Sequence, residues 1–470
     1  MKKIQAVHNV KTVFPLSPTR YLSGIIHVGN GTHKRSPLFA CWRNELTMAN
    51  YLCKTTWTSR FVANFAIRFA AWVVAASLGL GFFSSTASAQ PPQTDAATLQ
   101  AEIDKLFQEW RELLKIAAQH RIDYLGQDRA ESVVNRQKYE TAFDNALRKK
   151  MEIEVKLIEK LDVVDKPDKT LLRMVKSIAQ DLFIQERMER CYHLSKKLLQ
   201  FTPDDDDILL LWGGSAMVTN RFDDADKFRV ELGSLISGLP ENIRYLYDSD
   251  LNELRNMFAK EQEKRDAEAK ANDLPRVLIR TTKGDFVVEL YENEAPNTVG
   301  NFIFLVETGY YNRELPFHRV ISGFVAQGAE DTTGQPHYNI FDEHGSPNDR
   351  PHFAYTLAMA RTDQANTAAA EFYITFCPLL GLNQRYTTFG RVIEGFDVVD
   401  CLNRTAKKNS DGVEEPIKNV VMDKILLAKV LRKRPHEYRP KIFSQSKPLP
   451  GLDAKAVPPA QPSDNKTNDK

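Results

Sequence analysis

Cysteine is scarce in this 470-residue sequence, which contains only five. Two of them lie within residues 1–89, and the other three, Cys191, Cys377 and Cys401, are far apart in the chain. This spacing excludes a C-x-x-C motif and a cysteine metal cluster, and it predicts buried or free thiols. A disulfide between Cys377 and Cys401 is the alternative prediction, because an oxidising compartment would permit it.

Long hydrophobic runs are also lacking. The apolar stretch 69–83 is fifteen residues long, short of the ~20 that a membrane-spanning helix needs. Arg60 and Arg68 precede it, and a small-residue sequence, Ala-Ser-Ala, follows and ends at Ala89. A basic flank, a short apolar stretch and an A-x-A site are typical of a secretory signal peptide. We therefore expect residues 1–89 to be removed by cleavage after Ala89.

The beginning of this signal region is unusually long. Residues 1–47 carry no clear pattern, whereas Met48 begins a conventional basic segment, so we expect Met48 to be the true start. The processed chain is expected to be an exported protein of the periplasm or cell envelope, without stable insertion into the membrane.

The chain after residue 89 has no excess of basic side chains. Residues 1–89 hold ten Lys and Arg and the single acidic Glu45; without them, 53 basic and 60 acidic residues remain, a net charge of −7. This balance argues against a nucleic-acid partner, which requires a basic face. Metal-ligand spacing is likewise absent, so neither a metal nor another cofactor is expected. Five histidines after residue 190 lack such spacing: His193, His337, His344, His352 and His436.

Glycine and proline are infrequent from residue 98 to about 270, and apolar residues recur there at three- and four-residue spacing. Leu106, Trp110 and Leu113 form one such stripe. The pattern predicts an α-helical domain over 95–258. Within it, Trp212-Gly213, Phe222 and Ala225 resemble one tetratricopeptide unit, so a plain helical bundle and a partner-binding repeat array both stay open.

Two flanking segments lack an apolar stripe. The sequence AKEQEKRDAEAKAN begins at Ala259, and its charge predicts a solvated helical linker over 259–274 rather than a packed element. Residues 435–470 are rich in Pro, Lys, Ser and Asp, and we expect a disordered tail there.

Between these flanks, residues 275–434 show short β-type runs. A Lys-Gly turn separates the first two, which predicts a hairpin. An antiparallel barrel capped by two helices fits the order of the elements. Strands are expected at 277–279, 286–290, 353–358, 371–375, 388–392 and 421–430, and helices at 298–308 and 396–404.

Residues 317–328 read FHRVISGFVAQG, and the segments LAMART, EFYITF and TTFGRVIEGFDVVD follow in order. This combination resembles the cyclophilin family over about 160 residues. The resemblance implies an eight-stranded β-barrel closed by two helices, preceded here by the α-helical domain. It also implies a peptidyl-prolyl cis-trans isomerase that acts on X-Pro segments of unfolded or flexible proteins, here exported ones.

The chemistry of that reaction explains the residue types. Rotation about a prolyl amide loses resonance across a barrier of ~18–20 kcal/mol and leaves a localised lone pair on the proline nitrogen. A guanidinium beside that nitrogen can donate to the lone pair only in the twisted state, which is selective binding of the transition state.

By resemblance, Arg319 is the catalytic cation and Gln327 fixes the substrate backbone. His318 is expected to be a scaffold residue, because the reaction needs no base. The remaining substrate-binding positions implied by the resemblance are Phe324, Val325, Tyr373, Leu382 and Tyr386, which line the proline pocket, and Ala360, Arg361 and Glu371, which border the groove.

The sequence departs from the family at several positions around this site, three of which change the wall of the groove. Gly381 stands where many cyclophilins carry the tryptophan that contacts cyclosporin, Tyr386 replaces the usual histidine, and Glu371 replaces the groove glutamine. Weak cyclosporin binding is expected. An alternative function also stays open: a module that binds proline-containing peptides, or acts as a chaperone, with weak or no turnover, with the helical domain choosing its protein partner.

Overall fold

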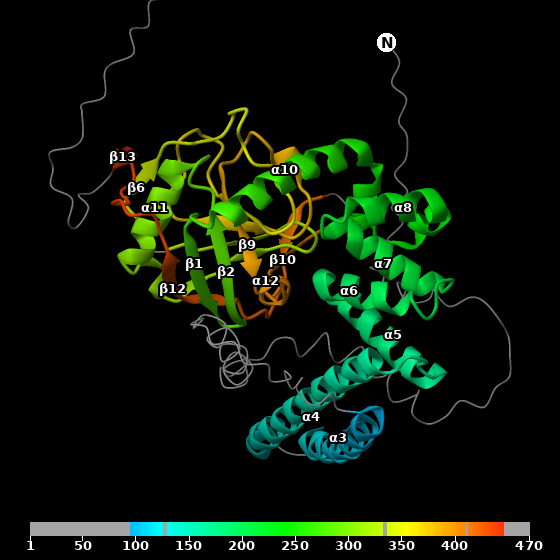
Figure 1. Ribbon diagram of the computed structural model, residues 1–470. Helices are drawn as coiled ribbons and strands as arrows, with labels where there is room; N and C mark the ends of the chain where they lie inside the picture. Colours follow the sequence, from blue (N-terminus) through cyan, green and yellow to red (C-terminus); the bar gives the residue numbers. More distant parts are fainter. Residues whose placement is uncertain (1–94, 126–128, 332–335, 410–411, 446–470) are drawn as a thin grey trace, which may run out of the picture. The chain divides into compact units, whose positions relative to one another are not determined.

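The computed structural model describes residues 95–125, 129–331, 336–409 and 412–445 (Figure 1). The expected signal peptide, Met48 and residues 446–470 lie outside these residues. Among the described helices, none combines the length and the apolar character needed to cross a membrane.

The first part of the described chain is helical, as expected. Asp168 accepts hydrogen bonds from the first backbone N–H groups of α5, and Asp205 does the same for α7, which explains where these helices begin. The elements are α3 (Ala96–Leu125), α4 (Arg129–Val163), α5 (Lys169–Ile184), α6 (Met188–Leu198), α7 (Asp206–Val218), α8 (Phe222–Leu232), η2 (Gly233–Gly238), α9 (Glu241–Arg244), η3 (Tyr245–Asp248) and α10 (Leu251–Ala271).

Helices α7 and α8 pack closely because Gly213 has no side chain. A Cβ atom at Gly213 would lie 2.3 Å from the ring of Phe228. Phe222 and Ala225 are buried in the same cluster. The expected helical hairpin is thus present, and its assignment as a tetratricopeptide unit stays a prediction.

A curled antiparallel sheet follows the helices. Its strands follow the order β3 (Leu315–Pro316), β12 (Lys424–Arg432), β1 (Arg276–Thr281), β2 (Gly284–Leu290), β9 (Thr388–Glu394), β7 (Thr356–Met359), β8 (Phe372–Thr375), β5 (Val325–Gly328) and β4 (Arg319–Val320). The edge strands β3 and β4 are separated by only two residues of the chain, and the backbone N–H of Phe317 between them donates to the carbonyl of Asp423. The continuous segment 315–320 therefore brings both edges of the sheet together. Counted as one strand, it makes the sheet the eight-stranded barrel expected from the sequence.

The expected strands and helices agree with the observed elements within a few residues. The sheet encloses a core in which Phe302, Phe317, Phe372 and Phe389 are buried, and α11 and α12 pack against it (Figure 1). The elements are β1 (Arg276–Thr281), β2 (Gly284–Leu290), α11 (Pro296–Glu307), η4 (Tyr310–Asn312), β3 (Leu315–Pro316), β4 (Arg319–Val320), β5 (Val325–Gly328), β6 (Tyr338–Ile340), β7 (Thr356–Met359), β8 (Phe372–Thr375), η5 (Leu380–Leu382), β9 (Thr388–Glu394), α12 (Phe396–Asp400), β10 (Ala406–Lys408), β11 (Glu414–Pro416), β12 (Lys424–Arg432) and β13 (Ile442–Gln445).

The expectation of a solvated linker over 259–274 is wrong for part of α10. Glu261 is only 3% exposed, and it accepts hydrogen bonds from Arg350 at 2.7 and 2.8 Å and from Arg265 at 2.7 Å. Buried charges of this kind are stable only when paired. This part of α10 therefore packs against the barrel through its charged residues and is not a solvated spacer.

The expectation of disorder is also wrong for residues 435–445. Tyr438 is buried in the barrel core, where its hydroxyl donates to Glu292 at 2.9 Å, and β13 pairs with β6. One aromatic anchor and a short strand thus hold this segment despite its polar composition.

The alternative prediction, a disulfide between Cys377 and Cys401, is wrong because the bond is not formed. Cys191, Cys377 and Cys401 are all free. Burial raises the pKa of Cys377 to about 12, and its thiol donates to the carbonyl of Gly323 at 3.2 Å. Free and mostly buried thiols agree with the first interpretation of the sequence.

Candidate active site

Strand β4 and the turn that follows place Arg319 beside an apolar surface. Val320 points into the core, so its neighbour Arg319 lies on the opposite face of the strand. Arg319 pairs with Gln327 of β5, and Gly323 has a positive φ of 60° in the connecting turn, a conformation that favours glycine. This turn places the ring of Phe324 5.5 Å from the Arg319 guanidinium carbon.

The sequence-predicted pocket residues lie together in one apolar cluster. Val325 and Tyr373 are buried in neighbouring strands, β5 and β8. The Tyr373 and Tyr386 rings meet edge to face, with their centroids 5.9 Å apart. Ala358 is fully buried beside them. Five partly buried residues pack around these three: Phe324, Ala360, Leu379, Leu382 and Tyr386.

Ala358 and Leu379 were not predicted as pocket residues. Ala358 faces Tyr373 across the pairing of β7 and β8. Its position in LAMART, two residues before Ala360, places both on one face of a strand, and this alternation is the signal that could have found it. No comparable signal marks Leu379.

The polar side of the site is a chain of hydrogen bonds. Arg319 Nη1 donates to Gln327 Oε1 at 3.3 Å, and Gln327 Nε2 donates to Glu371 Oε2 at 3.1 Å. His318 Nε2 lies 3.7 Å from the same Glu371 oxygen. Three of the predicted polar residues, Arg319, Gln327 and Glu371, therefore form one connected group.

Arg319 has a second partner, which the sequence did not reveal. Its Nε donates to Glu414 Oε2 at 2.8 Å, and its Nη2 donates to Glu414 Oε1. These hydrogen bonds lower the pKa of the Glu414 carboxyl below its ordinary value. Lys408, which pairs with Glu414 across the hairpin, places its Nζ 4.4 Å from the Phe324 ring centroid. A short hairpin from a distant part of the chain thus contacts both Arg319 and Phe324.

Arg361 contacts the apolar cluster from one side. Its guanidinium lies 5.2 Å from the Tyr386 ring centroid and donates to the backbone carbonyls of Arg385 and Thr362, both at 2.8 Å. The side chain therefore fixes the loop that carries Tyr386.

A buried histidine is hydrogen-bonded to Tyr373 of the apolar cluster. His352 Nε2 lies 2.9 Å from the Tyr373 hydroxyl, and Nδ1 lies 3.0 Å from Asn383 Oδ1. An amide oxygen only accepts, so Nδ1 carries the proton and Nε2 accepts from Tyr373. Burial lowers the pKa of His352 to about 4, which keeps the imidazole neutral at neutral pH.

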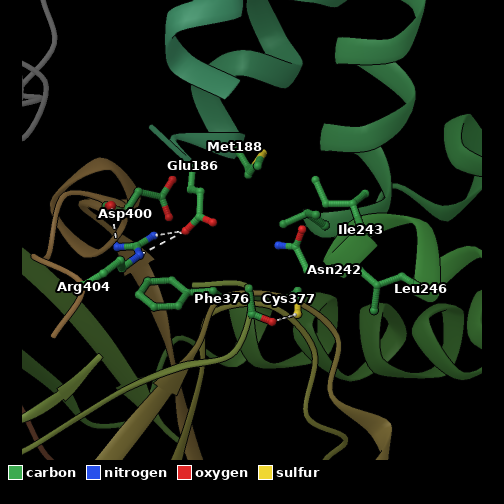
Figure 2. A pocket seen from close by; sticks show the side chains of 11 residues that line it. Glu186, Met188, Asn242, Ile243, Leu246, Phe376, Cys377, Asp400 and Arg404 are labelled. Atoms are coloured by element: carbon green, nitrogen blue, oxygen red, sulfur yellow. Dashed lines mark hydrogen bonds and ion pairs between the residues drawn. The ribbon is translucent and has the colours of Figure 1, made fainter. Parts of the chain in front are cut away.

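The helical part of the chain reaches the turn before Phe324. Glu186 accepts a hydrogen bond from Ser322 and pairs with Arg404 at 2.8 Å, and a Cβ atom on Gly323 would lie 2.6 Å from Asn242 Nδ2. Figure 2 shows the joined Glu186 and Arg404 on one side of a cavity and Asn242 on the other.

This cavity is too small for a peptide. Its volume is about 20 Å³, room for one water molecule. Asp400 lines it, and burial raises the pKa of this carboxyl to about 8. The cavity is therefore a small gap in the packing between its lining residues and not a substrate site.

Comparison with known proteins gives a consistent result. Residues 276–426 match the family described as cyclophilin type peptidyl-prolyl cis-trans isomerase/CLD. The chain is 36% identical over 166 residues to peptidyl-prolyl cis-trans isomerase-like 1 of Neurospora crassa, covering 34% of this chain and 97% of the relative. It is 37% identical over 163 residues to peptidyl-prolyl cis-trans isomerase cyp18 of Streptomyces antibioticus, covering 31% and 95%.

Solved structures are similar to about a third of the chain. A crystal structure of a Cryptosporidium parvum cyclophilin type isomerase is 27% identical, with a TM-score of 0.28, covering 34% of this chain and 99% of that one. A second structure of that protein, determined in the presence of the dipeptide Ala-Pro, is 28% identical, with a TM-score of 0.27, covering 33% and 98%.

Proposed function

The chain belongs to the cyclophilin-type peptidyl-prolyl cis-trans isomerases, and we propose that Arg319 and the apolar cluster around Tyr373 carry out its isomerisation. One observation carries this proposal: the Arg319 guanidinium lies at the edge of the cluster, 5.5 Å from the Phe324 ring. A proline ring placed among Phe324, Val325 and Tyr373 would have its nitrogen within reach of that cation.

In the proposed mechanism, Arg319 donates to the proline nitrogen as the amide twists. The planar amide nitrogen has no lone pair to offer, so this hydrogen bond forms only near the transition state. No bond breaks and no proton is transferred. Gln327 holds the peptide backbone beside the pocket, and its own bond to Glu371 fixes its orientation.

The energetics require both the cation and the pocket. Bringing an event of tens of seconds to milliseconds requires roughly 10⁴-fold, or about 5.5 kcal/mol. One charge-assisted hydrogen bond contributes ~1.5–3 kcal/mol. The remainder is assigned to the pocket, which excludes water and so strengthens the interaction between the guanidinium and the nitrogen.

The test is turnover of an Ala-Pro tetrapeptide in a protease-coupled assay. We expect Arg319→Ala to lower kcat/KM about 10- to 100-fold, the value of one charge-assisted hydrogen bond. Arg280→Ala is the matched control, because Arg280 belongs to the same sheet and pairs with Asp285 near the surface. An Arg319→Ala variant as active as the control contradicts the mechanism. A parent that binds the peptide without turnover supports the alternative binding module.

We further propose that the substrates are X-Pro segments of exported proteins, and that the helical region selects or docks a protein partner. The apolar stretch 69–83 and the Ala-Ser-Ala site ending at Ala89 support export. N-terminal sequencing of the protein from the cell-envelope fraction tests this: a chain beginning at Gln90 is expected. Retention of residues 69–89 in the cytoplasmic fraction contradicts it.

A further inference from the structure

The hairpin formed by β10 and β11 is attached directly to the strand that carries Arg319. Ile321 forms a parallel bridge with Ala406, and Thr405 exchanges two hydrogen bonds with the backbone of Val320, at 2.8 and 2.9 Å. Gly412, with a φ of 77°, lies in the hairpin's connection. The attachment fixes the position of Glu414 relative to Arg319.

Glu414 occupies the edge of the guanidinium that is best suited to bidentate bonding. Nε and Nη2 both donate to its carboxylate, and Nη1 donates to Gln327. Three of the five N–H groups of Arg319 are thus engaged within the protein. A carboxylate in this position also neutralises much of the positive charge that a twisted prolyl nitrogen would feel.

The pair lies in a partly exposed position, which limits its strength. The side chains of Arg319 and Glu414 are 30% and 35% exposed. Ion pairs in such surroundings are screened by water and salt and exchange readily. Opening of this pair would leave the guanidinium available to substrate.

We propose that Glu414 is a built-in competitor for the catalytic guanidinium. Preferred substrates are therefore X-Pro segments that carry a basic side chain next to the proline. A lysine or arginine of the substrate takes over the Glu414 carboxylate and releases Arg319, whereas an acidic side chain leaves the pair in place. This inference rests on the proposed role of Arg319 and adds the substrate class.

The experiment compares the full chain with Glu414→Gln, using three Xaa-Pro peptides that carry Lys, Gln or Glu next to the proline, at low ionic strength. For the Gln peptide, we expect Glu414→Gln to raise kcat/KM about two- to fivefold, the range for an exposed ion pair. In the parent, the Lys peptide should be turned over faster than the Glu peptide, and Glu414→Gln should reduce that ratio by at least about twofold.

Glu415→Gln provides the matched control. It makes the same change of charge one residue further along β11, where Glu415 accepts from Asn409 at 3.1 Å and not from Arg319. The control should keep the parent's rates and its ratio between peptides. Raising the salt concentration should bring the parent and Glu414→Gln together, because salt screens the pair.

Two results overturn the inference. In the first, Glu414→Gln leaves kcat/KM for the Gln-containing peptide unchanged or lowers it. In the second, the variant leaves the ratio of kcat/KM between the Lys and Glu peptides unchanged. These failures are distinct from failure of the proposed function. If Arg319→Ala itself has no effect on turnover, the role of Arg319 is wrong. If Arg319→Ala abolishes turnover and Glu414→Gln does not raise it, only the competition is wrong.

Discussion

At the scale of single residues, the pocket depends on hydrogen bonds behind it as well as on the apolar side chains that line it. The Tyr373 hydroxyl is held by His352, whose other ring nitrogen is held by Asn383. Tyr373 and Tyr386 then meet edge to face. The orientation of the pocket wall therefore depends on a neutral, buried imidazole.

The low pKa of His352 gives a pH dependence of stability. The unfolded chain's histidine binds a proton below a pH of about 6.5, whereas the folded one does so only near 4. The stabilising contribution is thus complete above about 6.5 and is lost as the pH falls towards 4. Relative to His352→Gln, the parent's free energy of unfolding should fall by up to about 1.4 kcal/mol per pH unit in this window.

Urea unfolding of both proteins between pH 4 and 8 measures this difference. Above a pH of about 7 the two curves should run parallel, which serves as the internal control. Parallel curves over the whole range would show that the imidazole titrates normally in the folded protein.

The sequence named most residues of the apolar cluster one by one, but it did not reveal the partner of Arg319. Phe324, Val325 and Gln327 lie within a continuous motif whose residue types match the chemistry. Glu414 lies 95 positions from Arg319, in a charged stretch that reads as a solvated surface. Only the attachment of the hairpin to β4 brings its carboxylate to the site.

At the scale of elements, α10 packs against the barrel through charged side chains. Glu261, Arg265 and Glu268 follow each other at helical spacing, so they share one face of the helix. Arg350 meets that face with its side chain fully buried and lies 4.0 Å from the Tyr291 ring centroid. The sequence predicted a helix here correctly. It could not predict burial, because the partner lies more than eighty positions away.

Removing Arg350 should therefore be costly. Arg350→Met leaves the buried Glu261 without its bidentate partner and also removes the bonds to Glu268 and Glu294. We expect the free energy of unfolding to fall by ~3–5 kcal/mol, as measured by urea denaturation. The same replacement at the exposed Arg280 should cost no more than ~1 kcal/mol. Equal, small losses for both variants would mean that the α10 contact contributes little.

At the scale of the whole molecule, helices and barrel share a hydrophobic cluster. Phe353 of the barrel region is fully buried against Phe222 and Phe258, at centroid distances of 5.9 and 4.9 Å. Asn220 adds two hydrogen bonds to the backbone of Ala354. The sequence predicted both the helical region and the barrel, since each has its own periodicity. It did not predict their shared core, because periodicity shows which face is apolar and not what covers it.

Phe353→Ala should weaken this shared core. We expect a loss of ~3–5 kcal/mol for a buried phenylalanine and, because the connection between the regions is weakened, two thermal transitions in place of one. Differential scanning calorimetry measures both effects. Leu431→Ala, at a position that is 51% exposed, should leave the transition almost unchanged. A single transition near the parent's midpoint for Phe353→Ala would show that the two regions are stable without this contact.

The central claim is that Arg319 accelerates rotation of the prolyl amide while the apolar cluster binds the proline. Exchange NMR on an Ala-Pro peptide, with a catalytic amount of the full chain, tests it most directly, because the method reports binding and cis-trans exchange in one sample. The account predicts rapid exchange with the parent, and peptide binding with exchange slowed about 10- to 100-fold for Arg319→Ala. Exchange at the parent's rate in Arg319→Ala, or binding without any exchange in the parent, would contradict it.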